Sequence, residues 1–281
     1  MNPSRYLPFL VRIRCGTHIA LLVVLALISP ACRPNGPKLL IRGDQLLQEG
    51  RPAEAVKAIE EAVQQMPGEA RAWNHLGLAY HANHNADAAR KAYLKALELN
   101  RNLVVAQYNL ANLELENGRN GEAEKGFKSF IDWNQNSGEA WAKLAIAQQR
   151  LQAWDAAESS ARTAIGLNEH DAESWNTLGV VQIQKRKTRD AYQSFLRAQK
   201  EQPQHPQSLL NLALTVHHQL KDPRSALIHY RNYATLNPEP SDAESIRAVV
   251  EQLELQFGLP SSLPAKQSQS VDFGIATAPH S

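Results

Sequence analysis

Asparagine side chains are the groups whose type and spacing first suggest chemistry in this sequence. An asparagine amide offers both a hydrogen-bond donor and an acceptor, which is what the backbone of a bound peptide requires. Five of them recur through the middle of the chain, at Asn74, Asn109, Asn112, Asn176 and Asn211. This series predicts either a surface that grips an extended segment of another protein or the solvated face of exposed helices.

Two pairs of histidines raise the question of a metal site. His81 and His84 are three residues apart, and His217 and His218 are adjacent. Neither pair has a cysteine or a convincing set of carboxylates nearby in the sequence, so we expect no metal and no cofactor. The sequence also holds no glycine-rich phosphate loop, no Gly-x-Ser-x-Gly and no His-Glu-x-x-His motif. We therefore predict a protein that is not an enzyme.

The first 31 residues have the pattern of an export signal. They hold three arginines and no acidic residue, and the unbroken apolar run Ile19–Ile28 is followed by small residues before Cys32. This run is shorter than the stretch of about 20 apolar residues that a membrane-spanning helix needs. We predict a cleaved signal over residues 1–31. An uncleaved anchor in the inner membrane is the alternative.

Cys32 would begin the mature chain as its single cysteine, because Cys15 leaves with the signal. An intramolecular disulfide is then impossible. The position resembles the lipid-attachment cysteine of bacterial lipoproteins, although Ser29 stands where that family prefers leucine. The resemblance implies a lipid at Cys32, a tether over residues 32–35 and, with Arg33 after the cysteine, the outer membrane. The alternative is ordinary cleavage that leaves Cys32 free.

Charge and composition exclude some partners and favour helices. The chain has 30 basic and 28 acidic residues, so no overall positive field attracts nucleic acid. Alanine, leucine, glutamine and glutamate, which are good helix formers, crowd its middle. An apolar share of 43% is enough for a core.

The organisation of the chain is a repeat of 34 residues. Trp73, Trp141 and Trp175 are separated by 68 and 34 residues, and this period divides the chain into six units. The units are 36–69, 70–103, 104–137, 138–171, 172–205 and 206–240, the last with one extra residue near Lys221–Pro223.

Fixed positions within the repeat predict a helical hairpin. The eighth position is always glycine or alanine, and the twentieth is always alanine, at Ala55, Ala89, Ala123, Ala157, Ala191 and Ala226. We predict two antiparallel helices of about 14 residues in each unit, with a turn near Gly50, His84, Gly118 and their equivalents. The small eighth residue should face the alanine at position 20, while large residues at positions 7 and 24 fill the space around them.

These columns resemble the tetratricopeptide repeat. The unit that begins at Ala70 is nearly ideal, with Trp73, Leu76, Gly77, Tyr80, Ala89, Tyr93 and Ala96. The resemblance extends over residues 36–240 and implies an all-α fold, a right-handed superhelix of six helical hairpins. Departures are local: Gln107 replaces the tryptophan, and Glu114, Gln148 and Gln182 replace the tyrosine.

The resemblance also implies a concave groove that is lined by the first helices and binds a protein or peptide partner. The matching positions of this sequence are Asn74, Leu78, Tyr108, Asn109, Asn112, Lys143, Asn176 and Asn211. Asn109 and Lys143 partly match the carboxylate clamp of chaperone-binding members. Glu139 stands where that clamp needs a second lysine, so we predict no clamp.

A capping helix and a tail should follow the repeats. Solenoids need a terminal element that covers the apolar face of the last unit. Ser241–Glu244 has the capping-box pattern, apolar residues follow at helical spacing, and Gly258 suits a helix end. We predict a capping helix within 241–258 and a disordered tail over residues 259–281.

Together these patterns predict an interaction scaffold of the bacterial cell envelope, tethered to the membrane by a lipid at Cys32. The design is similar to that of the pilotins of type IV pilus systems, which makes a pilotin-like assembly factor one alternative. A membrane-anchored co-chaperone, with the first segment retained, is another.

Overall fold

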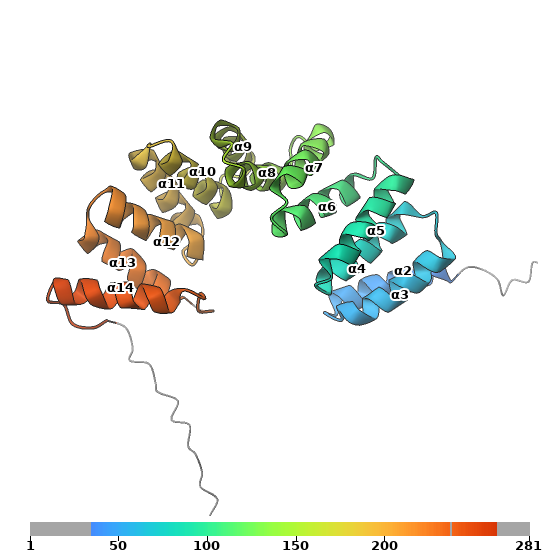
Figure 1. The fold of residues 1–281 in the computed structure, drawn as a ribbon, viewed down its shortest axis with the longest axis horizontal. Coiled ribbons are helices and arrows are strands. Elements are labelled where there is room, and N and C mark those ends of the chain that lie inside the picture. Colours follow the sequence, from blue (N-terminus) through green and yellow to red (C-terminus); the bar gives the residue numbers. More distant parts are fainter. Residues whose placement is uncertain (1–34, 237, 263–281) are drawn as a thin grey trace, which may run out of the picture.

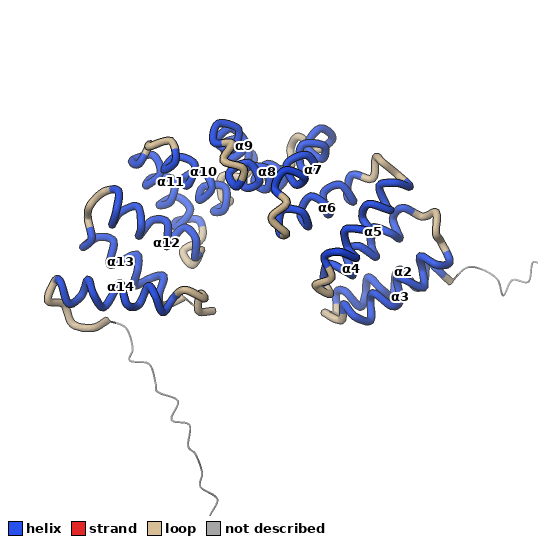
Figure 2. Tube along the Cα trace, viewed as in Figure 1, coloured by secondary structure: helices blue, strands red, loops and turns tan. Residues whose placement is uncertain are grey.

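The computed structural model describes residues 35–236 and 238–262. Throughout this part the chain forms helices and no strands (Figure 2). The helices are arranged as an arch, with α2 and α14 at its two ends (Figure 1). The predicted signal, Cys32 and residues 263–281 of the predicted tail lie outside the described residues. The expectation of an all-α superhelix of repeats is confirmed.

Successive helices form antiparallel pairs, one pair for each sequence repeat. The pairs are α2 (Gly36–Gln48) and α3 (Pro52–Gln65), α4 (Ala70–Ala82) and α5 (Ala86–Leu99), α6 (Val104–Glu116) and α7 (Asn120–Trp133), α8 (Gly138–Arg150) and α9 (Trp154–Leu167), α10 (Ala172–Gln184) and α11 (Thr188–Glu201), and α12 (Pro206–Leu214), continued by the π-helix η2 (Thr215–Gln219), with α13 (Pro223–Ala234). The single helix α14 (Ala243–Gln256) follows them.

Each hairpin turns through one residue in the left-handed backbone region. These residues have φ between 56° and 73°, and they are Gly50, His84, Gly118, Gln152, Arg186 and Lys221. In the fifth hairpin the N–H of Lys187 donates to the carbonyl of Gln182 at 2.8 Å, which is the Schellman bond that closes a helix end. The turn is thus built by backbone bonds, and it keeps its shape where glycine is absent.

The small residue at position 8 makes room for the side chain at position 24. A Cβ added to Gly77 would lie 2.4 Å from Cε1 of Tyr93, and one added to Gly179 would lie 2.5 Å from Cε1 of Phe195. Our expectation that position 8 faces the alanine at position 20 was therefore wrong for the nearest contact. The six alanines at position 20 are nevertheless completely buried.

Repeats with alanine at position 8 adjust the opposite helix. In the fourth repeat Ala145 shares a buried cluster with Ala161, the small residue at position 24. In the third, Ala111 meets Gly126 at position 23, where a Cβ would lie 2.7 Å from the Cβ of Ala111. Size on one helix is matched by space on the other.

The sixth repeat takes up its extra residue inside its first helix. The N–H of Leu220 donates to the carbonyl of Thr215 at 3.0 Å, an i to i−5 bond that belongs to a π-helix. The extra residue was expected near Lys221–Pro223, but the turn there has the same length as in the other repeats. The spacing of the repeats shows that one residue is inserted but does not show where. The first helix of the repeat accommodates this residue by widening one of its turns into a π-helix.

Departures from the usual repeat residues keep the bonds that those residues make. The indole N–H of Trp73 donates to the carbonyl of Pro67 at 2.9 Å, and Trp141 and Trp175 make the same bond to the residue six positions earlier. Gln107 replaces the tryptophan in the third repeat, and its Nε2 donates to the carbonyl of Arg101 at 2.8 Å.

Polar residues at position 11, where a tyrosine is usual, are buried with partners. Glu114 is 2% exposed, and its carboxylate accepts bonds from Arg90 at 2.6 Å and Arg119 at 3.1 Å. Gln148 accepts from the Ser160 hydroxyl at 2.8 Å. Gln182 accepts from Ser194 at 2.7 Å. Buried polar groups of this kind are tolerated because they are bonded.

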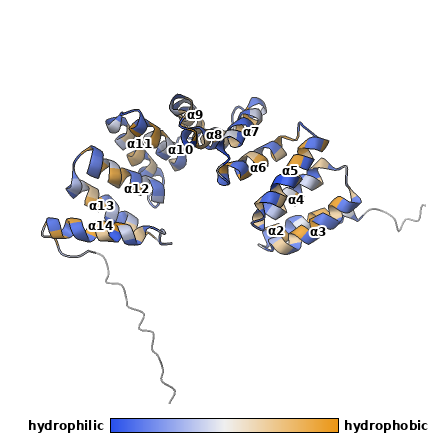
Figure 3. Ribbon diagram, in the orientation of Figure 1, coloured by the Kyte–Doolittle hydropathy of each residue, from blue (hydrophilic) through white to orange (hydrophobic). Residues whose placement is uncertain are grey.

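The order of packing leaves the first helices on the inner side of the arch. Each second helix packs on the first helix of the next repeat, and the helices α2, α4, α6, α8, α10 and α12 also contact one another in series. Second helices make no such contacts among themselves. In Figure 1 α7 and α9 lie on the outer edge, and in Figure 3 most helices carry both hydrophilic and hydrophobic residues along their length. The concave surface therefore belongs to the first helices.

Helix α14 covers the end of the last hairpin. Val250 and Leu253 are buried in one cluster with Tyr230 and the other core residues of the sixth repeat. The N-cap predicted at Ser241 is wrong, because the N-cap is Asp242, and its side chain makes no capping bond. The Tyr233 hydroxyl donates to that carboxylate instead. Gly258 adopts φ 65° after the helix, as its sequence position predicts.

The fit between positions 8 and 24 can be tested with two glycines. Gly77→Ala should lower the free energy of unfolding by about 1–3 kcal/mol, because its Cβ would overlap the Tyr93 ring. Gly166→Ala is the matched control, since nothing lies within 4 Å of the added Cβ on α9. It should leave stability unchanged or raise it by up to about 1 kcal/mol. Equal effects of the two changes in urea denaturation would contradict this account.

Candidate functional site: a central pocket on the concave surface

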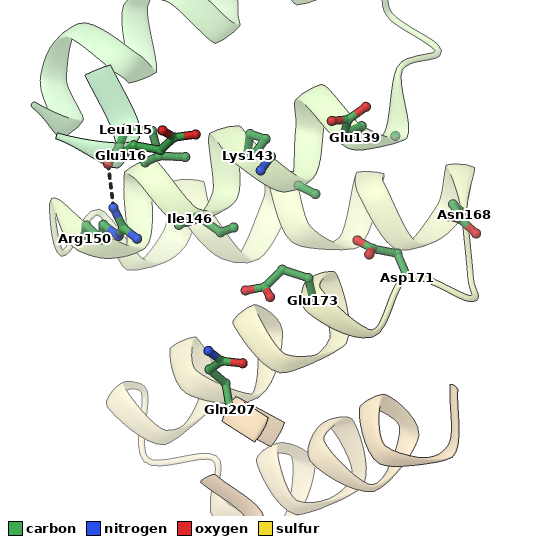
Figure 4. Close-up of a pocket in the computed structure, with 12 residues that line it drawn as sticks. Leu115, Glu116, Glu139, Lys143, Ile146, Arg150, Asn168, Asp171, Glu173 and Gln207 are labelled. Carbon is green, nitrogen blue, oxygen red and sulfur yellow. Dashed lines mark hydrogen bonds between the residues drawn. The ribbon is translucent and has the colours of Figure 1, made fainter. Parts of the chain in front are cut away.

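A hollow with a volume of about 790 Å³ lies on the inner surface, at the middle of the arch. Its walls come from the end of α6, from α8, from the loop before α10 and from the starts of α10 and α12. The lining residues are Leu115, Glu116, Gly138, Glu139, Ala142, Lys143, Ile146, Arg150, Asn168, Asp171, Glu173 and Gln207 (Figure 4).

Lys143 supplies an ammonium group without a partner. It is half-buried, it lines the pocket, and its Nζ forms no hydrogen bond or ion pair with any residue in the described part of the chain. Figure 4 draws it near the middle of α8. Arg150 follows seven residues later, which is two helical turns, so both cations share one face of the helix with Ile146 between them.

Arg150 is fixed at the edge of the pocket by a backbone carbonyl. Its Nη1 donates to the carbonyl oxygen of Leu115 at 2.7 Å. Leu115 lies in the last turn of α6, where carbonyls lack partners within the helix. The bond uses one of the five donors of the guanidinium, and the others form no bond with the described residues.

Three of the four acidic residues around the pocket are bonded to neighbours. Glu116 pairs with His81 at 2.7 Å, and Glu173 pairs with His205 at 3.1 Å. One oxygen of Asp171 accepts the Ser174 N–H at 3.1 Å and so caps α10. These bonds join neighbouring repeats or begin a helix, so the three carboxylates have structural roles.

Glu139 is the fourth carboxylate, and it lies near the buried Tyr108 hydroxyl. That hydroxyl makes no hydrogen bond of good geometry. Burial raises the pKa of Tyr108, and the neighbouring Glu139 carboxylate raises it further. Glu139 and Asp171 lie at the end of the pocket away from Arg150 (Figure 4).

The pKa of Glu173 responds to the charges around the pocket. The hydrogen bond from His205 is the main cause that lowers the pKa of this carboxyl, and the positive charges of Lys143 and Arg150 lower it as well. Neither cation is within ion-pair distance of it. The ionised form of Glu173 is thus stabilised mainly by His205, with further contributions from both cations.

The asparagines form pairs across neighbouring repeats. Asn109 Nδ2 donates to Asn74 Oδ1 at 3.0 Å, and Asn211 Nδ2 donates to Asn176 Oδ1 at 2.9 Å. Asn74 and Asn176 are only 4% and 6% exposed. Their amide oxygens therefore join first helices of adjacent repeats. The signal was in the sequence, because both pairs are separated by 35 residues, one more than the period.

The other predicted groove residues are distributed along the arch. Leu78 lines a second hollow of about 530 Å³, between α4 and α6. Asn211 lines a third of about 290 Å³, which is mostly apolar and is built partly by the π-helix η2. Tyr108 packs on Phe127 and Phe130, with ring centroids 5.8 and 4.7 Å apart, and Asn112 is half-buried.

Of the predicted groove residues, Lys143 alone lines the central pocket. Sequence reasoning missed Arg150 and Glu173. Arg150 lies seven residues after the predicted groove residue Lys143, on the same face of α8, so the signal for it was present in the sequence. Glu173 was missed because its role depends on His205, the N-cap of the next repeat.

Neither a metal cluster nor a membrane-crossing helix occurs in the described residues. No three histidine, cysteine or acidic side chains of that part come together as metal ligands. Over the same ranges, no helix has the length and apolar character needed to cross a bilayer.

Comparisons with known proteins agree on the family. Profiles described as tetratricopeptide repeat match residues 42–103, 142–206 and 92–125, together slightly more than half of the chain. No protein with a curated description matches the sequence significantly.

Several solved structures share the fold at low sequence identity. A tetratricopeptide repeat protein from Parabacteroides merdae has a TM-score of 0.66 at 15% identity, over 80% of this chain and 87% of that one. PilF of Pseudomonas aeruginosa has a TM-score of 0.63 at 17% identity, over 76% and 96%. YrrB, described as having an unusual peptide-binding site, has 0.53 at 19%, over 69% and 99%.

The depressed pKa of Glu173 predicts a stability difference that depends on pH. A carboxyl with a lower pKa in the folded chain stabilises the fold above its ordinary value of 4.5, and the effect is lost as pH falls below it. Wild type should therefore be more stable than Glu173→Gln at neutral pH, and the difference should shrink on acidification. Urea denaturation at several pH values measures it. Parallel pH profiles would show that Glu173 is not held in its ionised form.

Proposed function

The chain belongs to the tetratricopeptide repeat family, and from this premise we propose that it is a scaffold that holds a segment of another protein on its concave surface. The observation that carries the proposal is the central pocket, where the Lys143 ammonium has no partner among the described residues. A half-buried charge is costly unless it is paired. A bound segment would supply the missing partner.

We also propose that the protein does not catalyse a reaction. The histidines nearest the pocket, His81 and His205, are bonded to the carboxylates of Glu116 and Glu173 across helix junctions. That arrangement ties the solenoid together, so we assign these two histidines structural roles. Binding on a surface of fixed shape is the function that such a framework favours.

Capture of the native partner tests the groove. Lys143→Glu should reduce recovery of cross-linked partner from envelope preparations by about tenfold or more. The change replaces the unpaired positive charge with a fifth negative charge in the pocket, so the group that pairs with Lys143 would be repelled. Lys91→Glu on α5 is the matched control, since that lysine is exposed on a second helix, and it should leave recovery unchanged. The triple change of Asn109, Asn112 and Lys143 to alanine extends the test to the whole predicted groove. Equal recovery with all variants would remove the groove assignment.

We further propose that the protein is an envelope lipoprotein tethered through Cys32. The support is the sequence alone: a signal-like segment, small residues before the cysteine, and no other cysteine after it. A tether of residues 32–35 would join the lipid to α2 directly.

Mass spectrometry of the mature N-terminus tests the tether. We expect an N-terminal peptide that begins at Cys32 and carries acyl chains, and we expect Cys32→Ala to abolish the modification and release the protein from membranes. An intact Met1 would favour the membrane-anchored co-chaperone instead. An unmodified Cys32 at the N-terminus would favour plain secretion.

A pilotin-like assembly role is the second candidate. It is supported by the similarity of fold to PilF, which extends over 96% of that chain, together with the lipoprotein-like N-terminus. The identity of the partner captured above decides between the two. Pilotins help a secretin to reach the outer membrane. A captured secretin subunit that is lost with Lys143→Glu would therefore favour the pilotin-like role, and any other partner would favour a different scaffold.

A further inference from the structure

We propose that the central pocket recognises the order of two charges along a bound segment. An acidic side chain of the segment would lie between Lys143 and Arg150, and a basic side chain would lie against Glu139 and Asp171. This inference rests on the proposed function, because it names the chemistry of the partner that the groove would hold. It also assigns a direction to the bound segment.

The acidic side chain follows from which charges in the pocket are already bonded. Glu116, Asp171 and Glu173 are each bonded to a neighbouring residue, whereas the Lys143 ammonium has no partner in the described chain. Arg150 uses a single donor on the Leu115 carbonyl. This end of the pocket therefore holds positively charged hydrogen-bond donors that have no acceptor among the described residues. A carboxylate is the group that complements them.

A neighbouring carboxylate, Glu173, responds to both cations, although the hydrogen bond from His205 is the main cause that lowers its pKa. The charges of Lys143 and Arg150 both contribute to lowering the pKa of Glu173, although neither reaches it closely enough to form an ion pair. An acidic side chain from a partner, inserted nearer to the two cations, would feel the same two fields at shorter range. The aliphatic side chain of Ile146 lies between them and offers apolar contact to the stem of that residue.

The basic side chain follows from the opposite end of the pocket. Glu139 makes no ion pair with a described residue, and Asp171 uses only one of its two oxygens in capping α10. With Glu116 and Glu173 included, the four acids outnumber the two cations. A phosphate or a run of acidic residues would be repelled by this excess, whereas a segment with one charge of each sign is matched.

Selection from random peptide libraries tests the charge order. Short random segments are displayed between constant flanks, so that no free terminal carboxylate is present, and are selected on the purified protein. A second library ends in a free carboxylate, which distinguishes an acidic side chain from a chain terminus. Wild type is compared with Lys143→Glu/Arg150→Glu and with the control pair Lys91→Glu/Lys200→Glu, whose lysines are exposed on second helices. Circular dichroism checks the fold of each variant.

We expect wild type and the control pair to enrich the internal library in segments with an acidic and a basic residue at fixed separation. The double reversal should lose the acidic preference, with about tenfold weaker binding of the wild-type peptides. Glu139→Lys should lose the basic preference and keep the acidic one. Enrichment without acidic residues, enrichment confined to the free-carboxylate library, or the same preferences in the double reversal would overturn the inference.

The result separates this inference from the proposed function. Peptides that bind wild type and are blocked by groove substitutions, but show no charge order, would sustain the scaffold and end the present proposal. Peptides whose binding ignores every groove substitution would count against both.

Discussion

Close approach of two antiparallel helices is the constraint on which the whole molecule depends. In the second and fifth repeats it is reached because a glycine leaves space for a ring, Gly77 for Tyr93 and Gly179 for Phe195. In the fourth repeat Ala145 and Ala161 divide the same space more evenly. Since each hairpin stacks on the next, an error in one pair would tilt every later first helix, and the concave surface would lose its alignment.

Where a polar residue replaces the usual residue of a repeat, it makes hydrogen bonds of its own in the same place. Gln107 donates to the same carbonyl that a tryptophan reaches elsewhere, and Glu114 is neutralised by Arg90 and Arg119. These exchanges cost little stability because each of these buried polar groups keeps a hydrogen-bond partner. A departure from a family pattern is therefore a reason to look for the bond that replaces it before it is taken as irregularity or as a binding site.

The repeat, its helices and its turns were predictable because they depend on period and residue size. The left-handed residue of each turn falls where Gly50, His84 and Gly118 indicated it. The details that failed depend on contacts across the chain: which side chain position 8 meets, where the sixth repeat takes up its extra residue, and how α14 begins. Asn74 and Asn176 illustrate the same limit for the site, because their burial follows from the amides that donate to them from the next repeat.

The central pocket owes its charge pattern to the same stacking. Its cations both come from one face of α8, whereas its acids come from α6, α8, the loop before α10 and α10 itself. Two of these acids, Glu116 and Glu173, are bonded to histidines of neighbouring repeats. Three of the pocket carboxylates are bonded to a histidine or to a helix N-terminus, and Glu139, one turn before Lys143 on α8, makes no ion pair with it. Lys143 stays unpaired among the described residues, and the open charge on the concave surface arises in part because the junctions between repeats engage the other pocket carboxylates.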